Sequence, residues 1–415
     1  MIQRVNSEGF LSESDLFEFV REAFRSERID GKRLLFIIPD STRSMPMRIL
    51  FRALVGAARD RCAAADFLIA LGTHPPMSQE AINRLLGVTE AERRGEFASV
   101  HVFNHEWQNA DMLRHIGTIG AQTIAELSNG LLSQEAQVLV NKRVFDYDMV
   151  ILVGPVFPHE VVGFSGGNKY FFPGVAGAEI LNLFHWLGAL ITNPVINGTK
   201  NTPVRAVIDK AASMVRVETR CFCLNVTGAD TRGIFYGSAE ESWSAAADLA
   251  AQTHIVYKNR PFRSVLAVAP AMYDDIWVAG KCMYKLEPVV EDGGELIIYA
   301  PHISEISYTH GRLIRRIGYH TRDYFLAQMD RFRDIPGGIL AHSTHVRGIG
   351  TYENGVEKPR IKVTLATQIP CDVCEAINLG YRDPASIDPE KWRGKEDQGV
   401  LLVEHAGEIL YRLGR

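Results

Sequence analysis

The sequence predicts an α/β protein with two domains, each built around a mostly parallel sheet. The chain has 415 residues, which is more than one ordinary hydrophobic core accommodates, so two domains are expected. Short apolar runs alternate with helical patterns, and this alternation is typical of parallel sheets with helices packed on them. A polar stretch at 258–261 is typical of a domain boundary, so we predict domains at 1–255 and 256–415.

In the first half of the chain, helix-start signals separate the apolar runs. Ser12, followed by Asp15, forms a helix N-cap pattern ahead of a helical repeat of apolar residues. Pro46 suits the first turn of a second helix, and Ser78 suits the N-cap of a third. Strands are predicted around these helices, at 34–38, 67–71, 100–103 and 149–153.

In the second half, a helix followed by a polar segment covers about 240–262, and another helix is predicted over 274–290. The stretch 337–358 shows no regular pattern, so we expect a long irregular loop there, carrying His342, His345 and Arg347. Loops of this length inside compact domains are often functional. Strands are predicted at 264–268, 295–299, 361–366 and 400–403.

The composition is that of a soluble globular protein, with 46% hydrophobic and 23% charged residues. A net charge of -4 provides no basic surface, so neither nucleic acid nor an anionic membrane is an expected partner. The first twenty residues are too acidic for a signal or transit peptide, and no apolar run is long enough to span a bilayer. We therefore expect a cytoplasmic protein.

The six cysteines are too few for a disulfide framework. Cys371 and Cys374 form a single C-x-x-C pair, and Cys221 and Cys223 a single C-x-C pair. A zinc ribbon needs two C-x-x-C pairs at suitable spacing, so reduced structural thiols are predicted.

Three predicted strands of the first domain end in loops with chemically capable side chains. The strand at 34–38 leads to Asp40 and Arg43, the strand at 67–71 to His74, and the strand at 149–153 to His159. In an open α/β sheet, the loops at the carboxyl ends of the strands line one crevice. We therefore predict an active site here, in the cleft between the two domains.

The richest of these loops runs from Pro158 to Gly174. Its Ser165-Gly166-Gly167 element lets backbone N–H groups approach a ligand closely, and Lys169 is a potential nucleophile or point charge. His185 follows in an apolar helix, where a single histidine is usually a hydrogen-bonded core residue. Asp40 could equally cap a turn or a helix, with Arg43 as its ion-pair partner.

These motifs resemble those of the lactate racemase family, enzymes that use a nickel-pincer nucleotide. The resemblance covers most of the chain and is sharpest at Asp40-Ser-Thr-Arg43, at Gly72-Thr-His74-Pro-Pro-Met77, and from Pro158 through Gly174 to His185. It implies that domain 1–255 binds the cofactor and that domain 256–415 closes over the substrate. It also implies Lys169 as the covalent attachment point, His185 as the nickel ligand, and His74 and His159 as acid/base residues.

The resemblance further implies two sets of binding residues. Lys281, Arg43 and Val278 fall at substrate-contacting positions, although the family has Gln where this chain has Val278. The segment 342–347 falls where the family places an aromatic-containing segment over the active site. The residues implied to contact the nucleotide are Asp40, Ser41, Thr42, Arg43, Ser165, Gly166 and Gly167.

The expected function is racemisation or epimerisation of a small 2-hydroxy acid or sugar acid, by reversible hydride transfer to the nickel-pincer nucleotide. A metal-dependent hydrolase or dehydratase is an alternative, and it predicts a metal held by three or more protein ligands. A non-catalytic nucleotide-binding protein is a second alternative, for which two acid/base histidines would have no use. The oligomeric state is not predicted.

Overall fold

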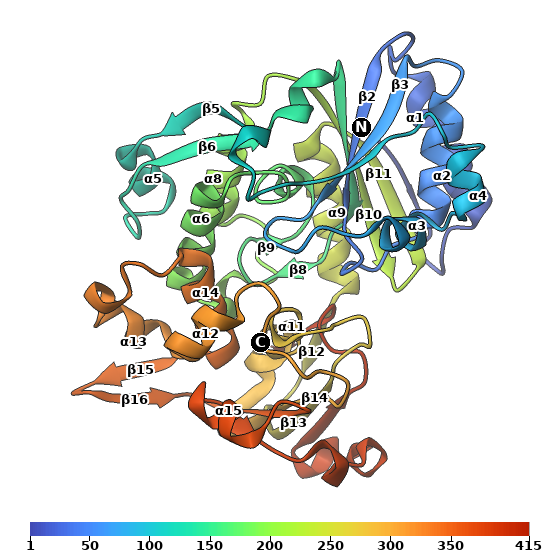
Figure 1. The fold of residues 1–415 in the computed structure, drawn as a ribbon. Helices are drawn as coiled ribbons and strands as arrows, with labels where there is room; N and C mark the ends of the chain where they lie inside the picture. The colour runs from blue at the N-terminus through green and yellow to red at the C-terminus, as the bar shows by residue number, and fades with distance from the viewer. Residues whose placement is uncertain (415) are drawn as a thin grey trace. The chain divides into compact units, whose positions relative to one another are not determined.

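A computed structural model describes residues 1–414, which fold into two compact units (Figure 1). The first unit contains Met1–Phe157, Ser165–Leu181 and Ala206–Ala250. The second contains Pro158–Phe164, Asn182–Arg205 and Ala251–Arg415. The predicted division at residue 255 falls close to the last of these transitions, and two earlier segments of the chain also belong to the second unit.

The first unit is built on a seven-stranded sheet in the order β1-β11-β10-β7-β2-β3-β4. The strands from β10 to β4 are parallel to their neighbours, and β11 and β1 are antiparallel additions at one edge. The strands span Ile2–Val5 (β1), Arg33–Pro39 (β2), Ala64–Ala70 (β3), Val102–Asn104 (β4), Met149–Pro155 (β7), Glu218–Thr227 (β10) and Asp230–Gly237 (β11).

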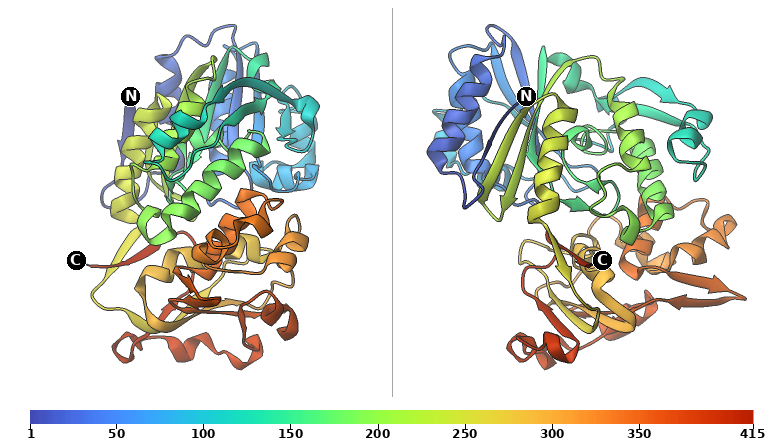
Figure 2. Two further views of the ribbon diagram at one scale, coloured as in Figure 1. Left: turned by 90° about the vertical axis from the view of Figure 1, so that its left-hand side faces the viewer. Right: turned by 180° about the vertical axis from the view of Figure 1, so that it is seen from behind.

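Helices cover both faces of this sheet (Figure 2). On one face lie α1 (Glu13–Arg25) and α2 (Met47–Ala58), and on the other lies α9 (Ala239–Thr253). The predicted cap of the first helix is confirmed, because the Ser12 side chain accepts from the Asp15 N–H and the Asp15 side chain accepts from the Ser12 N–H. The predicted α/β class with mostly parallel strands is therefore correct for this unit.

The core under α1 and α2 is rich in phenylalanine. Phe36 of β2 and Phe67 of β3 stack with their ring centroids 4.9 Å apart, and Phe51 of α2 lies 5.1 Å from Phe67. All three are fully buried. Because the two strands are adjacent and in register at this pair, the aromatic cluster holds together the part of the sheet that leads to the predicted site.

Gly154, near the end of β7, has less room for a Cβ than the other glycines of this sheet. A Cβ there would lie 1.7 Å from the Tyr170 hydroxyl oxygen and 2.3 Å from its Cζ. We expect Gly154→Ala to displace the buried Tyr170 ring and to lower the free energy of unfolding by about 1–3 kcal/mol, the usual cost of overpacking.

Urea denaturation of Gly154→Ala beside Gly56→Ala would measure this effect. Gly56 lies in α2, where an added Cβ would meet nothing within 4 Å, so alanine is expected to be neutral or stabilising there. Equal stability of the two variants would contradict the expectation.

The second unit has a five-stranded, fully parallel sheet in the order β18-β17-β14-β13-β19. A separate parallel pair joins β12 (Ile255–Lys258) to β20 (Leu410–Leu413). The predicted strands of the second half are all present in the main sheet. Its strands span Phe262–Val268 (β13), Val290–Ala300 (β14), Lys362–Thr367 (β17), Gly380–Tyr381 (β18) and Val400–Val403 (β19).

The helix predicted over 274–290 is wrong as a single helix. The chain forms α10 (Ile276–Ala279), α11 (Lys281–Leu286) and a 3₁₀ turn, η4 (Glu287–Val289). The first break falls at Gly280, where a Cβ would lie 2.5 Å from the Tyr284 hydroxyl oxygen. Glycine at this point allows the Tyr284 ring to pack directly on the backbone.

The irregular loop expected over 337–358 is also wrong. The segment forms α14 (Gly337–Arg347) and a hairpin of β15 (Gly350–Glu353) and β16 (Val356–Pro359). Residues 338 to 346 of α14 are all buried. A helix buried on every side has no polar face, so its sequence lacks the amphipathic repeat by which a helix is recognised.

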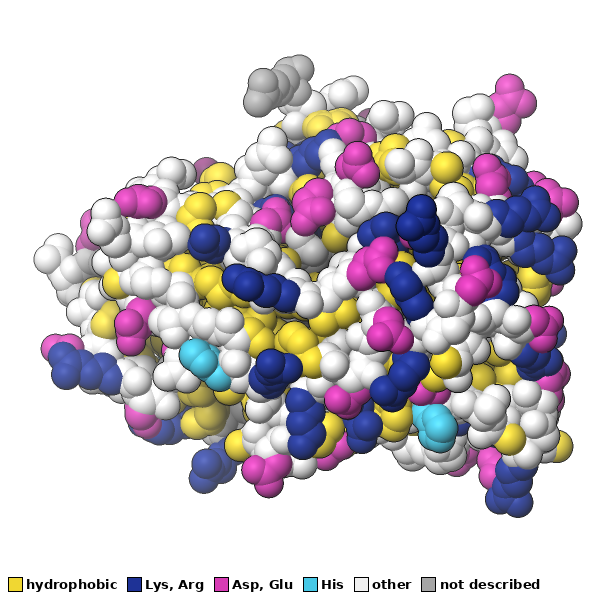
Figure 3. Space-filling view, turned by 90° about the horizontal axis from the view of Figure 1, so that it is seen from above, with side chains coloured by type: hydrophobic (Ala, Val, Ile, Leu, Met, Phe, Trp, Pro, Cys, Tyr) yellow, Lys and Arg dark blue, Asp and Glu magenta, His cyan; other side chains and the backbone are white. Residues whose placement is uncertain are grey.

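Three further observations concern the cysteines, the surface charges and the helices. All six cysteines are free thiols, including the pair Cys371 and Cys374. Positive and negative side chains are interspersed on the face seen in Figure 3. Among the helices within residues 1–414, none has the length and apolar character needed to cross a membrane.

Candidate functional site

Three loops meet at the carboxyl edge of the first unit's sheet, after the neighbouring strands β7, β2 and β3. The Gly72 N–H donates to the Gly174 carbonyl at 3.0 Å, and the Gly174 N–H donates to the Lys169 carbonyl at 3.2 Å. These bonds tie the loop that carries His74 to the segment that carries Lys169. The structure thus brings together two loops that lie far apart in the sequence.

His74 forms a close pair with Asp40. Its Nδ1 lies 2.5 Å from Asp40 Oδ2, while Asp40 Oδ1 accepts from the Thr42 N–H at 3.0 Å and from the Thr42 hydroxyl at 2.6 Å. Asp40 is buried and His74 is half-buried. A carboxylate on Nδ1 holds the neutral imidazole in the tautomer with a proton on Nδ1, which leaves Nε2 able to accept one.

The electrostatics of the pair favour an ionised Asp40. Burial acts to raise the pKa of this carboxyl group, but the charge and hydrogen bond of His74, the hydrogen bond from Thr42 and the charge of Arg43 outweigh it. The pKa of Asp40 is therefore held well below its usual range. The Thr42 and Arg43 side chains thus help to keep a charged hydrogen-bond acceptor beside His74.

We expect Asp40→Asn to destabilise the fold in a pH-dependent way. A carboxyl group whose pKa is lowered on folding stabilises the fold above its unfolded-state pKa of 3.8, and this contribution is lost as pH falls toward the folded-state value. The substitution should cost about 1–3 kcal/mol at pH 7, the typical worth of a charged hydrogen bond, and progressively less below pH 3.8.

Thermal or urea unfolding of Asp40→Asn at pH 7 and near pH 3 measures this difference. Asp60→Asn, at an exposed position, is the matched control and should be near neutral at both values. A destabilisation by Asp40→Asn that does not change with pH would contradict the assigned role of the charge.

The loop around Lys169 is held by packing of its own backbone. The Ser165 hydroxyl accepts from the Phe157 N–H at 2.9 Å, and the Trp243 indole N–H donates to the Ser165 carbonyl at 2.9 Å. Gly167 has a positive φ of 59°, and a Cβ there would lie 2.8 Å from Trp243 Cβ. Ser165 and Gly167 therefore shape the loop that presents Lys169, which is half-buried on the 3₁₀ turn Gly167–Tyr170.

Tyr170 lies close enough to the Asp40 loop for the charges of Arg43 and Asp40 to act on its hydroxyl group. Its side chain is buried, and burial raises the pKa of the Tyr170 hydroxyl far above its usual value, while the charge of Arg43 acts in the opposite direction. Arg43 also donates to the Thr42 carbonyl at 3.5 Å. A cation is thus placed beside the Lys169 loop, at the end of β2.

His159 lies in the second unit, on the short hairpin of β8 (Pro158–His159) and β9 (Gly163–Phe164). Its Nδ1 lies 3.1 Å from the Val161 N–H nitrogen and 3.4 Å from Glu160 Oε2. The Lys285 ammonium group donates to the Pro158 carbonyl. His159 is therefore a second histidine with a carboxylate at Nδ1, and unlike the half-buried His74 it is buried.

His185 is carried by α6 (Ala178–Ile191), in the part of that helix that belongs to the second unit. Its ring stacks on Phe184 with centroids 5.0 Å apart, and the side chain is half-buried. It lies near His342, whose pKa is lowered well below its usual value by burial and then by the charges of His345, His310 and His185.

His342 has no ring nitrogen to spare for a ligand. Its Nδ1 is hydrogen-bonded to the Tyr284 hydroxyl at 2.9 Å and its Nε2 to the Tyr319 hydroxyl at 3.3 Å. Its ring also stacks on Trp277 with centroids 4.1 Å apart. Arg347 is likewise engaged, since it donates to the Asn378 carbonyl at 2.7 Å.

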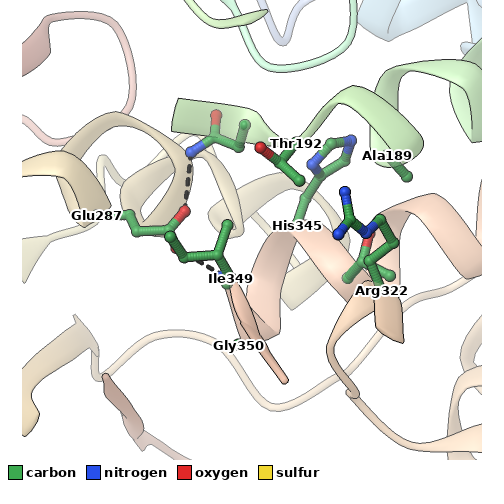
Figure 4. Close-up of a pocket in the computed structure, with 10 residues that line it drawn as sticks. Ala189, Thr192, Glu287, Arg322, His345, Ile349 and Gly350 are labelled. Atoms are coloured by element: carbon green, nitrogen blue, oxygen red, sulfur yellow. Dashed lines mark hydrogen bonds between the residues drawn. The ribbon is translucent and has the colours of Figure 1, made fainter. Parts of the chain in front are cut away.

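His345 differs, because its Nε2 is buried and has no hydrogen-bond partner within residues 1–414. Burial lowers the pKa of His345 to about 4, so the ring is neutral at pH 7. It lines a small cavity of about 40 Å³, where its ring lies between Thr192 and Arg322 (Figure 4). A space of this size accommodates a water molecule that would satisfy Nε2.

Of the three predicted substrate residues, Arg43 follows β2 in the first unit, whereas Val278 lies in α10 and Lys281 at the start of α11. Lys281 is half-buried, with its ammonium nitrogen 4.8 Å from the centroid of the Tyr273 ring. Val278 is buried, and its N–H donates to the Asp275 carboxylate at 2.9 Å. In the part of the chain that the structure describes, no three His, Cys, Asp or Glu side chains are grouped so that they could hold a metal ion.

Residues 19–195 match the lactate racemase N-terminal domain. Over this segment, the chain is similar to the lactate racemase family. The lactate racemases of Thermoanaerobacterium thermosaccharolyticum and Lactiplantibacillus plantarum are 26% and 25% identical to it, over 284 and 279 residues. Each match covers 65% of this chain and only 60% of the length of the relative.

Two solved structures resemble this protein along nearly its whole length. A Thermotoga maritima protein of known crystal structure has a TM-score of 0.89 and 32% identity, over 97% of this chain and 99% of its own. The lactate racemase apoprotein of T. thermosaccharolyticum has a TM-score of 0.72 and 18% identity, over 97% and 94%. The second likeness establishes the fold alone.

Proposed function

We propose that this protein is a racemase or epimerase of a small 2-hydroxy acid, and that it works with a nickel-pincer nucleotide. The observation that carries the proposal is the pair of histidines, His74 and His159, each with a carboxylate at Nδ1. Histidine is the side chain whose pKa lies nearest neutral pH, and a carboxylate at Nδ1 adapts it for proton transfer at Nε2.

The chemistry of the substrate explains the need for two such residues. The C2 hydrogen of a 2-hydroxy acid is weakly acidic, because the neighbouring carboxylate disfavours a second negative charge. Oxidation to the 2-keto acid and reduction on the opposite face inverts the centre without a carbanion. In each direction the hydroxyl group loses or gains a proton, and the two enantiomers present that group at different places. His74 and His159 would serve one enantiomer each.

The residues present fit the attachment of an anionic nucleotide, most of them in the first unit and His185 in the second. Lys169 supplies a half-buried amine, Arg43 a guanidinium group, and Ser41 and Thr42 hydroxyl groups in the adjoining loop. His185 supplies an imidazole nitrogen, which is a good ligand for nickel. When bound, the nickel-pincer nucleotide supplies a carbon that reversibly accepts hydride. By family resemblance Lys169 and His185 would hold it, and Ser165, Gly166 and Gly167 would shape the loop beside it.

A cation is also needed for the substrate carboxylate. Lys281 and Arg43 are the candidates that the resemblance gives, and both side chains are half-buried. Val278 adds a buried apolar side chain where the family has an amide. The loss of that polar contact favours an aliphatic 2-hydroxy acid over a substrate with a second polar group.

Inversion of the configuration at C2 tests the proposal. Cofactor-loaded enzyme would be incubated with C2-deuterated lactate, 2-hydroxybutyrate and malate, and the formation of the opposite enantiomer would be followed by chiral chromatography. Racemisation of at least one monocarboxylic acid is expected. If the loaded enzyme, its nickel content verified, inverts none of a broad panel of 2-hydroxy and sugar acids, the proposal is wrong.

A further inference from the structure

The contacts around His159 Nδ1 require opposite protonation states of that nitrogen. The Val161 N–H, 3.1 Å away, can donate only to an unprotonated Nδ1. The Glu160 carboxylate, 3.4 Å away, interacts favourably only with a protonated one. Both neighbours come from the same short turn, so the sequence of this loop itself creates the competition.

The two states differ in what the other ring nitrogen can do. When Nδ1 accepts from Val161, the neutral ring carries its proton on Nε2 and cannot take up a proton there. When Nδ1–H faces Glu160, Nε2 is unprotonated and can accept one. The contact with Glu160 also persists when the ring is doubly protonated, so it is compatible with every stage of proton uptake and release at Nε2.

We propose that Glu160 is the positioning residue of His159, and that its carboxylate holds the ring in the tautomer in which Nε2 can accept a proton. This inference rests on the proposed function, because it gives His159 a proton to move. A hydrogen bond between N–H and a carboxylate is about twice as strong as a neutral one, so Glu160 should prevail over Val161. The 3.4 Å separation is long, as is common for such contacts before a substrate binds.

The surroundings of Glu160 are suited to this role. Its side chain is only 15% exposed, and its charge acts on two buried neutral groups, Tyr284 and His345. The hairpin that carries it is tied down by Lys285, which donates to the Pro158 carbonyl. The backbone that carries Glu160 is therefore held in place, and its carboxylate lies directly beside the ring that it would orient.

Nitrogen NMR of histidine-labelled protein tests the proposal without cofactor or substrate. The His159 signals, assigned with His159→Gln, should show a protonated Nδ1 in the wild type. In Glu160→Ala, Val161 remains the neighbour of Nδ1, and the proton should move to Nε2. A wild-type ring already protonated on Nε2, or an unchanged tautomer in Glu160→Ala, would overturn the inference.

Kinetics of the loaded enzyme provide the second readout. Glu160→Gln, which keeps the shape of the side chain, should lower kcat about 10²-fold with KM changed little, and Glu160→Asp should recover part of the loss. Glu357→Gln is the matched control, because Glu357 pairs with His320 Nδ1 at 2.7 Å elsewhere in the same unit. It should alter the His320 signals alone.

An unchanged kcat in Glu160→Gln would also overturn the positioning role. A wild-type enzyme that racemises no substrate while its His159 carries the predicted Nδ1 proton would instead count against the proposed function. The tautomer measurement thus separates the two failures.

Discussion

Replacing His74 or His159 by alanine is expected to stop racemisation, with a loss of at least about 10²-fold in turnover, the usual contribution of a general acid–base residue. In the proposed mechanism, racemisation joins two half-reactions, one for each enantiomer, and each histidine serves one of them. Loss of either stops the whole cycle, whichever enantiomer is supplied. Initial rates measured from both enantiomers of the substrate, by chiral chromatography, would test this.

A matched control is available in the same unit. His101 also pairs through Nδ1 with a buried carboxylate, Asp66, at 3.2 Å. Asp66 lies near the amino end of β3, whereas His74 follows its carboxyl end, so His101→Ala removes a similar pair away from the site. His101→Ala should racemise at the wild-type rate. Near-wild-type turnover by His74→Ala or His159→Ala would disprove the two-base mechanism.

The second large effect concerns attachment of the cofactor. Wild-type protein produced in cells that make the nickel-pincer nucleotide should show an added covalent mass, and Lys169→Ala should show none. Lys169→Arg is the informative comparison, because it keeps the positive charge and lacks the primary amine. Intact-mass spectrometry of the three proteins, with urea denaturation to verify their stability, would measure this.

If either Lys169 variant keeps the added mass, the attachment point is another residue. A wild-type protein without added mass, from cells in which a known lactate racemase is loaded, would count against the cofactor itself. Replacement of His185 by alanine is a weaker test, since it should reduce nickel content and leave the covalent adduct in place.

The fold was predictable where the local pattern and the tertiary environment agree. The strands β2 and β7 are apolar runs that become buried strands, and Ser12 caps α1 as its spacing with Asp15 suggests. The prediction failed at α14, because a helix buried on all sides carries no amphipathic signal. It failed again at Gly280, where only the packed Tyr284 ring reveals why the helix breaks.

The candidate site was predictable to a similar degree. The convergence of the Asp40, His74 and Lys169 loops follows from their position after neighbouring parallel strands. The carboxylates that lie beside the two histidines could not be predicted from the sequence. Asp40 was interpreted as a nucleotide contact, and the structure gives it His74 Nδ1 as well. Glu160 precedes a turn, and adjacency in sequence gives no sign that its carboxylate meets the His159 ring.

Because each unit is built from separate segments of the chain, folding during translation is affected. Segments Pro158–Phe164 and Asn182–Arg205 leave the ribosome well before Ala251–Arg415, the part with which they fold. Asn193 and Asn197 both donate to the carbonyl of Tyr284, and Asn193 also donates to the buried Glu287 carboxylate. Until that later segment is synthesised, these amides lack their partners at Tyr284 and Glu287.

Nascent chains in this interval expose surface that the finished protein buries, which favours misfolding and recruitment of chaperones. A gene fragment ending at residue 255 would remain in that state permanently. We therefore expect this interval of synthesis to be a vulnerable stage of folding. Synonymous codons that slow translation just before residue 251 should then reduce the soluble yield.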